Sequence, residues 1–214
     1  MVPGVAEEKP VHGPIRQQWI VRIGEDGDNV RCFQCADAPV DMQNHAFVTH
    51  THPDHVGGHS SGIKIPGVNE LLSKCKLKVV VHKAEADALK GLAPSDIIKA
   101  ESGDKIDVGG VEIQLLHTPG HTPGSQCFLV DGRVISGDTM FIDACGRVDF
   151  PGGNAEQMYY SLTQKLMALP DDTILFPGHN YARLPHATIG EQKKTNPYLK
   201  FASLKQFLAA MGYR

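Results

Sequence analysis

Short apolar runs, separated by turn residues, occupy the middle of the chain and predict β-strands. The runs cover residues 46–48, 78–81, 111–116, 126–130, 133–136 and 174–176. The runs at 126–130 and 133–136 flank Asp131-Gly132, a dipeptide typical of two-residue hairpin turns. Two further strand patterns lie nearer the N-terminus, at 19–23 and 30–33.

Two other stretches place apolar residues at the three- and four-residue intervals of an amphipathic helix. The first contains Met158, Leu162, Leu166 and Leu169. Asn154 is expected to cap it, with Gln157 at the capping-box position, and Pro170 is expected to end it. The second stripe has Leu204, Phe207, Leu208 and Met211, and a short helix is also expected over 56–61. Strands alternating with such helices predict an α/β or α+β sandwich.

One hexapeptide carries most of the candidate chemistry. His50-Thr51-His52-Pro53-Asp54-His55 follows the first apolar run directly, so its side chains are expected on a loop that leaves a strand. Imidazole nitrogens and carboxylate oxygens are ligands for zinc, iron or manganese. Histidines at alternate positions can converge on one ion while Asp54 and His55 turn toward a second. A chance cluster of surface histidines would rarely place four such groups in six residues.

Three later fragments each place a further ligand type after an apolar run and a Gly or Pro turn. The ligands are His121, which follows Pro119-Gly120, Asp138, which follows Gly137, and His179, which follows Pro177-Gly178. We therefore expect one ion at His50, His52 and His121. A second ion is expected at Asp54, His55 and His179, with Asp138 as a carboxylate that bridges the two.

The order and spacing of these seven residues resemble the metallo-β-lactamase superfamily, whose pattern is H-x-H-x-D-H, a distant His, a bridging Asp and a final His. The resemblance spans about residues 46–200. It implies an αββα sandwich with the metal site at one edge. Relatives usually have a helix before the metal loop, for which 37–44 is too short, so the first layer is expected to be abbreviated. Residues 1–14 look like a loose leader, and 186–214 like a short helical tail.

Two further segments resemble the glyoxalase II and persulfide dioxygenase branch of that superfamily. One runs from Gly137-Asp138-Thr139-Met140-Phe141 to Cys145-Gly146-Arg147-Val148-Asp149-Phe150, and the other has Gly190-Glu191 and Thr195-Asn196-Pro197-Tyr198-Leu199. In both groups nearby side chains contact a glutathione moiety. By that resemblance Arg147 and Tyr181 are expected to bind substrate. A guanidinium can form paired hydrogen bonds with a glycyl carboxylate.

The resemblance implies two enzyme activities, which the ligands alone do not separate. The first is a metal-dependent hydrolase, a glyoxalase II-like thioesterase with two divalent ions, zinc or else iron or manganese. A metal-bound hydroxide, oriented by Asp54, would attack an S-acylglutathione-type thioester. The second is an iron-dependent persulfide dioxygenase acting on glutathione persulfide, with a single Fe(II) at His50, His121 and Asp138. The segment 147–150 is more similar to the dioxygenase group.

We rank the hydrolase first and the dioxygenase second. Lactonase and β-lactamase activities use the same hydroxide chemistry, but Arg147 and the Asn196-Pro197 segment count against them. A non-catalytic metal-binding module would need a missing ligand or a blocked site, and all seven ligand positions are filled.

Composition narrows the remaining possibilities. At 214 residues, with 41% apolar and 21% charged residues, the chain fits one domain over 1–214. A net charge of -3 with scattered basic residues predicts no nucleic-acid partner, and no run has the length to cross a membrane. Five cysteines without a secretory segment predict reduced thiols, with the Cys32 and Cys35 pair more often structural than redox-active. We expect a cytoplasmic protein with a small-molecule substrate, compatible with a homo-oligomer.

Overall fold

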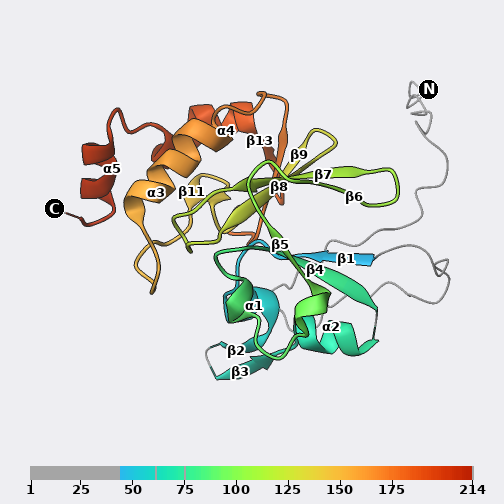
Figure 1. Ribbon diagram of the computed structural model, residues 1–214. Helices are drawn as coiled ribbons and strands as arrows, with labels where there is room; N and C mark the ends of the chain where they lie inside the picture. The colour runs from blue at the N-terminus through green and yellow to red at the C-terminus, as the bar shows by residue number, and fades with distance from the viewer. Residues whose placement is uncertain (1–43, 61, 75, 214) are drawn as a thin grey trace, which may run out of the picture.

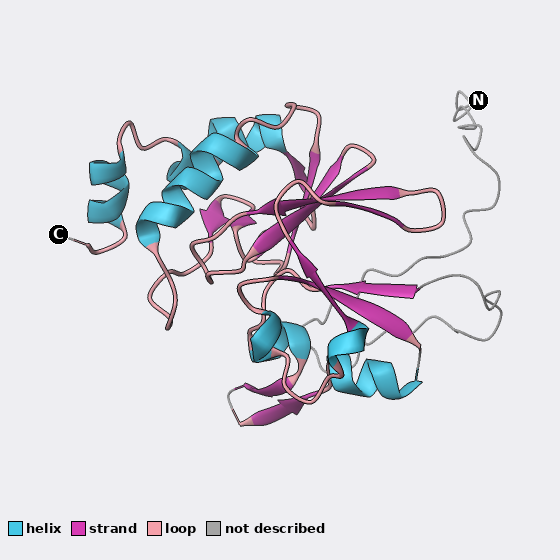
Figure 2. Cartoon of the chain, viewed as in Figure 1, coloured by secondary structure: helices cyan, strands magenta, loops and turns pink. Residues whose placement is uncertain are grey.

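The computed structural model describes residues 44–60, 62–74 and 76–213 (Figure 1). The expected leader, the strand patterns at 19–23 and 30–33, the abbreviated first layer and the Cys32 and Cys35 pair lie outside the described residues. Two β-sheets form the centre of the described part, and helices lie on the outside (Figure 2).

The larger sheet has six strands in the order β13-β12-β9-β8-β7-β6. Their bounds are Lys105–Asp107 (β6), Glu112–His117 (β7), Gln126–Val130 (β8), Arg133–Gly137 (β9), Ile174–Pro177 (β12) and Ala187–Thr188 (β13). Neighbours are antiparallel except for β9 and β12, which are parallel. The expected hairpin of β8 and β9 is confirmed, with φ of 46° at Asp131 and 70° at Gly132. Positive φ at both turn residues is the geometry that makes Asp-Gly favourable there.

The smaller sheet has three parallel strands in the order β1-β4-β5, with bounds Asn44–Phe47 (β1), Leu77–His82 (β4) and Ile97–Ala100 (β5). Two small hairpins complete the strands, formed by Gly58–Ser60 (β2) with Ile63–Ile65 (β3) and by Met140–Phe141 (β10) with Ala144–Cys145 (β11). Two single turns of 3₁₀ helix lie between β4 and β5, at Ala86–Ala88 (η2) and Pro94–Asp96 (η3).

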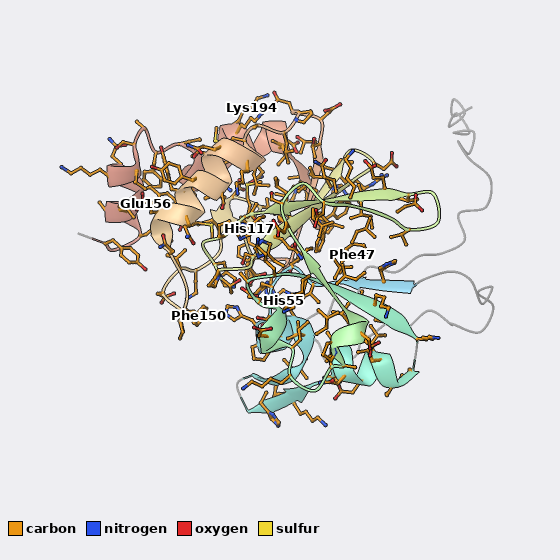
Figure 3. All side chains as sticks on the ribbon, viewed as in Figure 1. Phe47, His55, His117, Phe150, Glu156 and Lys194 are labelled. Atoms are coloured by element: carbon orange, nitrogen blue, oxygen red, sulfur yellow. The ribbon has the colours of Figure 1, made fainter. Side chains whose placement is uncertain are left out.

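The two sheets pack face to face through alternate residues of their strands. Val80 of β4 and Leu115 of β7 belong to the cluster between the sheets. Phe47 of β1 meets Phe128 of β8 there, with ring centroids 5.4 Å apart at an angle of 68°, and Figure 3 labels Phe47 between the sheets. The residues next to these along each strand, such as Val79, face outward.

Helices cover both outward faces. Helix α2 (Val68–Lys74) supplies Val68 to a cluster with Ala46 and Val79 of the smaller sheet. Helix α3 (Ala155–Tyr160), continued by the π-helix η4 (Ser161–Leu166), covers the larger sheet, in a cluster that includes Cys127, Val134, Leu175, Met158, Leu162, Leu166 and Phe207. Phe207 comes from α5 (Leu204–Ala210), so the C-terminal apolar stripe packs into the core. The order helix, sheet, sheet, helix confirms the αββα sandwich.

The structure corrects two expectations about helices. The helix expected over 56–61 is wrong, because α1 spans Pro53–Val56 and is followed by β2. Proline suits the first position of a helix, and Gly57, with φ of 97°, ends it. The capping box is half formed: the Asn154 side chain accepts from the Gln157 N–H, but the Asn154 N–H donates to the Gly120 carbonyl instead. In the described part of the chain, no helix combines the length and apolar character needed to cross a membrane.

Two histidines stack where β4 and β7 end. The rings of His82 and His117 lie 3.8 Å apart and nearly parallel, at 7°. Burial, and then the neighbouring His117, lower the pKa of His82 from 6.5 to about 4. Burial also lowers the pKa of His117. Both rings are therefore neutral in the folded protein near pH 7.

Acid should destabilise the metal-free protein through this stack. The pKa of His82 is lower in the folded protein than in the unfolded chain, so its neutral form contributes stability above pH 6.5 that is lost as the pH falls toward 4. The loss attributable to His82 between pH 7 and pH 4.5 is about 2 kcal/mol in the free energy of unfolding. Urea denaturation of the wild type and of His82→Phe at pH 7 and pH 4.5 measures it. The variant should lose less stability with acid, and parallel pH curves would contradict the assignment.

Candidate metal centre

The seven predicted ligands come from loops of both sheets and meet at one edge of the sandwich. His50 and His52 follow β1, and α1 begins directly after them, so that Asp54 and His55 lie in its single turn. The other ligands come from the larger sheet: His121 lies between β7 and β8, Asp138 follows β9, and His179 follows β12.

Parallel pairing explains why two ligands distant in the sequence lie together. Gly137 and Pro177 are partners in the β9–β12 ladder, and the Gly178 N–H donates to the Gly137 carbonyl over 2.9 Å. The ends of parallel strands meet at the same edge of a sheet. Asp138 and His179, one or two residues past those ends, therefore emerge side by side.

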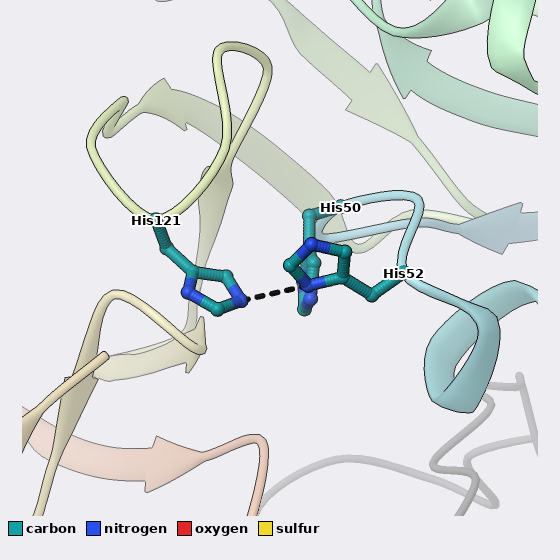
Figure 4. Close-up of side chains that lie close together, drawn as sticks. All are labelled: His50, His52 and His121. Carbon is teal, nitrogen blue, oxygen red and sulfur yellow. Dashed lines mark hydrogen bonds between the residues drawn. The ribbon is translucent and has the colours of Figure 1, made fainter. Parts of the chain in front are cut away.

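The first expected group, of three histidines, is assembled in the structure. His121 Nε2 lies 2.9 Å from His52 Nδ1 (Figure 4). The His50 ring lies 4.8 Å from that of His52 and 4.7 Å from that of His121, between centroids. One nitrogen of each ring can approach a common point, because the three atoms lie within 4.8 Å of one another.

The second expected group, of Asp54, His55 and His179, lies next to the first. His55 Nε2 is 3.2 Å from His179 Nε2, and His179 Nε2 is 3.4 Å from Asp54 Oδ2. Asp138 contacts both groups, with its carboxylate 3.6 Å from His121 Nε2 and 3.3 Å from both His55 Nε2 and His179 Nε2. The structure thus brings all seven predicted residues together, with Asp138 between the groups.

The distances between ligand atoms in these groups, and a buried nitrogen without a hydrogen-bond partner, fit the binding of metal ions. Two ligand atoms on one tetrahedral ion are about 3.4 Å apart, since each lies about 2.1 Å from the ion. The measured separations scatter around that value. His50 is 1% exposed, and its Nε2 has no hydrogen-bond partner among the described residues. A buried polar atom without a partner is costly, and a metal ion would satisfy it.

One hydrogen bond outside the groups fixes the orientation of His121. Its Nδ1 lies 2.7 Å from the Arg147 carbonyl, which can only accept, so Nδ1 carries the proton. Nε2 is then unprotonated and faces the other ligands. This is the arrangement in which imidazole binds a metal, with the second nitrogen held by a carbonyl.

Comparison with known proteins identifies the fold. Residues 36–179 match the model of the family described as the metallo-beta-lactamase superfamily. The chain belongs to this superfamily. All seven predicted ligand positions lie within the matched residues.

Named relatives of this superfamily member include persulfide dioxygenases. The mitochondrial persulfide dioxygenase ETHE1 of Homo sapiens is 32% identical over 173 residues, covering 78% of this chain and 61% of the human protein. The crystal structure of ETHE1 from Myxococcus xanthus is 34% identical with a TM-score of 0.65, covering 80% of this chain and 70% of that one. A protein named TTHA1623, solved in a di-iron-bound form, is 33% identical with a TM-score of 0.56, covering 72% of this chain and 77% of that one.

This metallo-beta-lactamase chain is similar to only part of its first curated relatives. It spans 61% of the human ETHE1 protein and 49% of a protein from Mycobacterium leprae that is 40% identical over 111 residues. The activity of a whole relative therefore enters below as a proposal.

The side chains of the two ligand groups strongly shift each other's pKa values. Burial lowers the pKa of His50 well below its usual value, and its neighbour His55 lowers it further. Burial alone would raise the pKa of Asp138, but hydrogen bonds to His179 and His55 outweigh it and hold the pKa far below its usual range. Hydrogen bonds to Asp138 and then Asp54 raise the pKa of His179 to about 10. In the metal-free protein His179 thus carries a proton, which a bound ion would displace.

Arg147 and Tyr181, the expected substrate contacts, lie on different sides of the metal groups. Arg147 is exposed and donates to Asp149 from Nε over 2.9 Å and from Nη2 over 2.7 Å. Its guanidinium also lies 4.3 Å above the ring of Phe150. Tyr181 is 65% exposed and lies against His179, with ring centroids 5.5 Å apart at 23°.

Phe150 forms an apolar wall beside the three-histidine group. This role of Phe150 was not predicted from the sequence. Its ring lies 5.4 Å from that of His52 and 6.1 Å from that of His121, edge to face. The side chain is 38% exposed, a large fraction for a phenylalanine. A phenylalanine directly after the Arg147-Val148-Asp149 tripeptide was visible in the sequence, but its direction depends on the fold.

The C-terminal segment supports the site from behind. Helix α4 (Ile189–Thr195) leads into Asn196 and the 3₁₀ turn η5 (Pro197–Leu199). Asn196 is fully buried, and its amide donates to the carbonyls of Phe141 and Ala144 in the β10–β11 hairpin. That hairpin joins Asp138 to Arg147. The asparagine of the motif thus holds the hairpin in place rather than facing the metal groups.

Proposed function

We propose that this protein is an iron-dependent persulfide dioxygenase that acts on glutathione persulfide. The observation that carries the proposal is the similarity to persulfide dioxygenase ETHE1, which covers 78% of this chain in the human protein and 80% in the Myxococcus xanthus structure. The geometry supports it, because Arg147, Asp149 and Phe150 lie together beside His52 and His121. This reverses the ranking from the sequence, which put the hydrolase first.

The residues of the site have separate roles in this proposal. His50, His121 and Asp138 would hold one iron, which would supply the redox chemistry that transfers oxygen to the persulfide sulfur. His121 is held in its binding tautomer by the Arg147 carbonyl. Arg147 uses Nε and one Nη2 proton on Asp149, which leaves its Nη1 end free of that pair to bind a substrate carboxylate. Phe150 keeps water from one side of the centre.

Oxygen consumption tests the proposal. Glutathione persulfide is added to the iron-loaded chain, and the rate is compared with that of iron-free protein and of buffer, because persulfides also oxidise without catalysis. Rapid uptake that depends on bound iron is the expected result. No uptake above the controls, from protein whose iron content has been measured, would overturn the proposal.

A glyoxalase II-like thioesterase is the second candidate. It is favoured by the closeness of Asp54, His55 and His179, a second metal-binding group that a single-iron enzyme does not require. The similar di-iron-bound structure of TTHA1623 also favours two ions. In this reading Asp54 orients the attacking water. The variant Asp54→Ala distinguishes the two candidates. A single-iron dioxygenase should keep its iron and its oxygen uptake in this variant. A two-metal hydrolase should lose one metal ion and its thioester hydrolysis.

Arg147→Ala should raise KM for the glutathione-linked substrate about tenfold with little change in kcat, because a charged hydrogen bond to the substrate carboxylate is made equally in ground and transition states. Steady-state kinetics measures both constants. Arg133→Ala is the matched control, since Arg133 is also exposed and paired with an aspartate two residues away, Asp131, but outside the site. Equal kinetics in the two variants would remove Arg147 from substrate binding.

A further inference from the structure

A buried carboxylate outside the seven ligands joins the two loops that carry the histidine group. Glu85 follows β4 and directly precedes η2, and it is 7% exposed. Glutamate is rarely buried to this extent unless its carboxylate is satisfied by hydrogen bonds or charge. Its position in the sequence, within Lys83-Ala84-Glu85-Ala86, matches no ligand motif.

Each oxygen of the Glu85 carboxylate binds a different metal-site loop. Oε2 accepts from both the backbone N–H and the hydroxyl of Thr51, each over 2.8 Å. Oε1 accepts from the Gly124 N–H, also over 2.8 Å. Thr51 stands between His50 and His52 in the chain, and Gly124 is three residues after His121. One carboxylate therefore connects the backbones beside all three members of the first group.

The contact to Gly124 depends on the absence of a side chain there. A Cβ at this position would lie 2.7 Å from Cγ of Glu85 and 3.0 Å from its Cβ. Real Cβ atoms do not approach other atoms so closely, so any larger residue would push the carboxylate or the loop away. The glycine allows its backbone N–H to reach Oε1 of Glu85. Glycine is therefore required at this position by the hydrogen bond to Glu85 and not by the conformation of the turn.

We propose that Glu85 is a positioning residue for the metal centre, which holds the loop of His50 and His52 against the loop of His121 and so sets the affinity for the ion that His50 and His121 share in either ligand set. The proposal rests on metal binding by these ligands, and it is independent of which reaction follows. Three charge-assisted hydrogen bonds from one carboxylate are strong and directional. Ligands held in advance bind an ion more tightly, because less freedom is lost when it arrives.

Cobalt(II) binding to the metal-free chain of 214 residues tests the proposal. Glu85→Gln keeps the shape of the side chain but turns one acceptor into an N–H₂ that faces the N–H donors. The variant should bind Co²⁺ about 10- to 100-fold more weakly, with a change in the visible absorption of the bound ion that reports altered ligand geometry. Glu101→Gln is the control, because Glu101 is an exposed glutamate paired with Lys83 in the same region. It should bind Co²⁺ like the wild type.

The thermal unfolding temperature of the metal-free variants separates positioning from general stability. A folded Glu85→Gln protein with unchanged Co²⁺ affinity and spectrum would overturn the proposal, even if it unfolds at a lower temperature. If that variant does not fold, Thr51→Val decides, since it removes only the hydroxyl bond to Oε2. A several-fold loss of Co²⁺ affinity is then expected, and wild-type affinity would overturn the proposal. A failure of oxygen uptake would overturn the dioxygenase and leave these results standing.

Discussion

Replacing Asp138 with alanine should abolish turnover and strongly weaken metal binding. The Asp138 carboxylate contacts members of both groups, His121 on one side and His55 and His179 on the other. Its loss removes a ligand and a buried negative charge from a centre that must hold dications. We expect the affinity for metal to fall by at least about 100-fold and the rate by about 10³-fold or more.

Metal content and oxygen uptake, measured on the same preparation, check this result. Asp171→Ala is a suitable control, because Asp171 is an exposed aspartate paired with Lys193 away from the centre. The control should keep its metal and its rate. Full metal content together with near-wild-type turnover in Asp138→Ala would contradict the centre described above.

Gly120→Ala should destabilise the protein by about 3 kcal/mol or more in the free energy of unfolding. Gly120 has φ of 140°, a conformation that other residues adopt only with strain. An added Cβ would also lie 2.5 Å from the backbone nitrogen and Cα of Met158 in helix α3, atoms that cannot move away without shifting the helix. Because His121 is the next residue, weaker metal binding should accompany the loss.

Urea denaturation of the metal-free protein measures the effect of Gly120→Ala. Gly103→Ala separates strain from crowding, since Gly103 also has positive φ, 94°, but a Cβ there would meet nothing within 4 Å. The control should cost about 1 kcal/mol, the strain alone. Equal losses in the two variants would show that the contact with Met158 is not rigid.

The ligand set was predictable from sequence because it rests on local patterns. His50 to His55 are neighbours in the chain, and His121, Asp138 and His179 each follow a strand and a turn, so a rule about strand ends is sufficient to place them. Apolar runs and the Asp131-Gly132 turn likewise predicted strands β1, β4, β7, β8, β9 and β12 and the β8–β9 hairpin. Their confirmation reflects interactions between residues a few positions apart.

Glu85 was not predictable, for the opposite reason. Its partners Thr51 and Gly124 are 34 and 39 residues away, and a single glutamate after a strand has no local signature. Asn154 shows the same limit on a smaller scale. The sequence identified the cap, but a tertiary contact with Gly120 took the backbone N–H that the capping box would have used. The short helix α1 begins at Pro53 and ends where the predicted helix begins, because proline suits the first helical position and Gly57 ends the turn.

The ligands are divided between the two sheets, four from the loop after β1 and three from the loops of the larger sheet. A bound ion is therefore also a cross-link between the two halves of the sandwich. By mass action, an ion present at 100 times its dissociation constant would add about 2.7 kcal/mol to the folded state. The resistance of this protein to unfolding, and with it to proteolysis, would then follow the supply of metal in its surroundings.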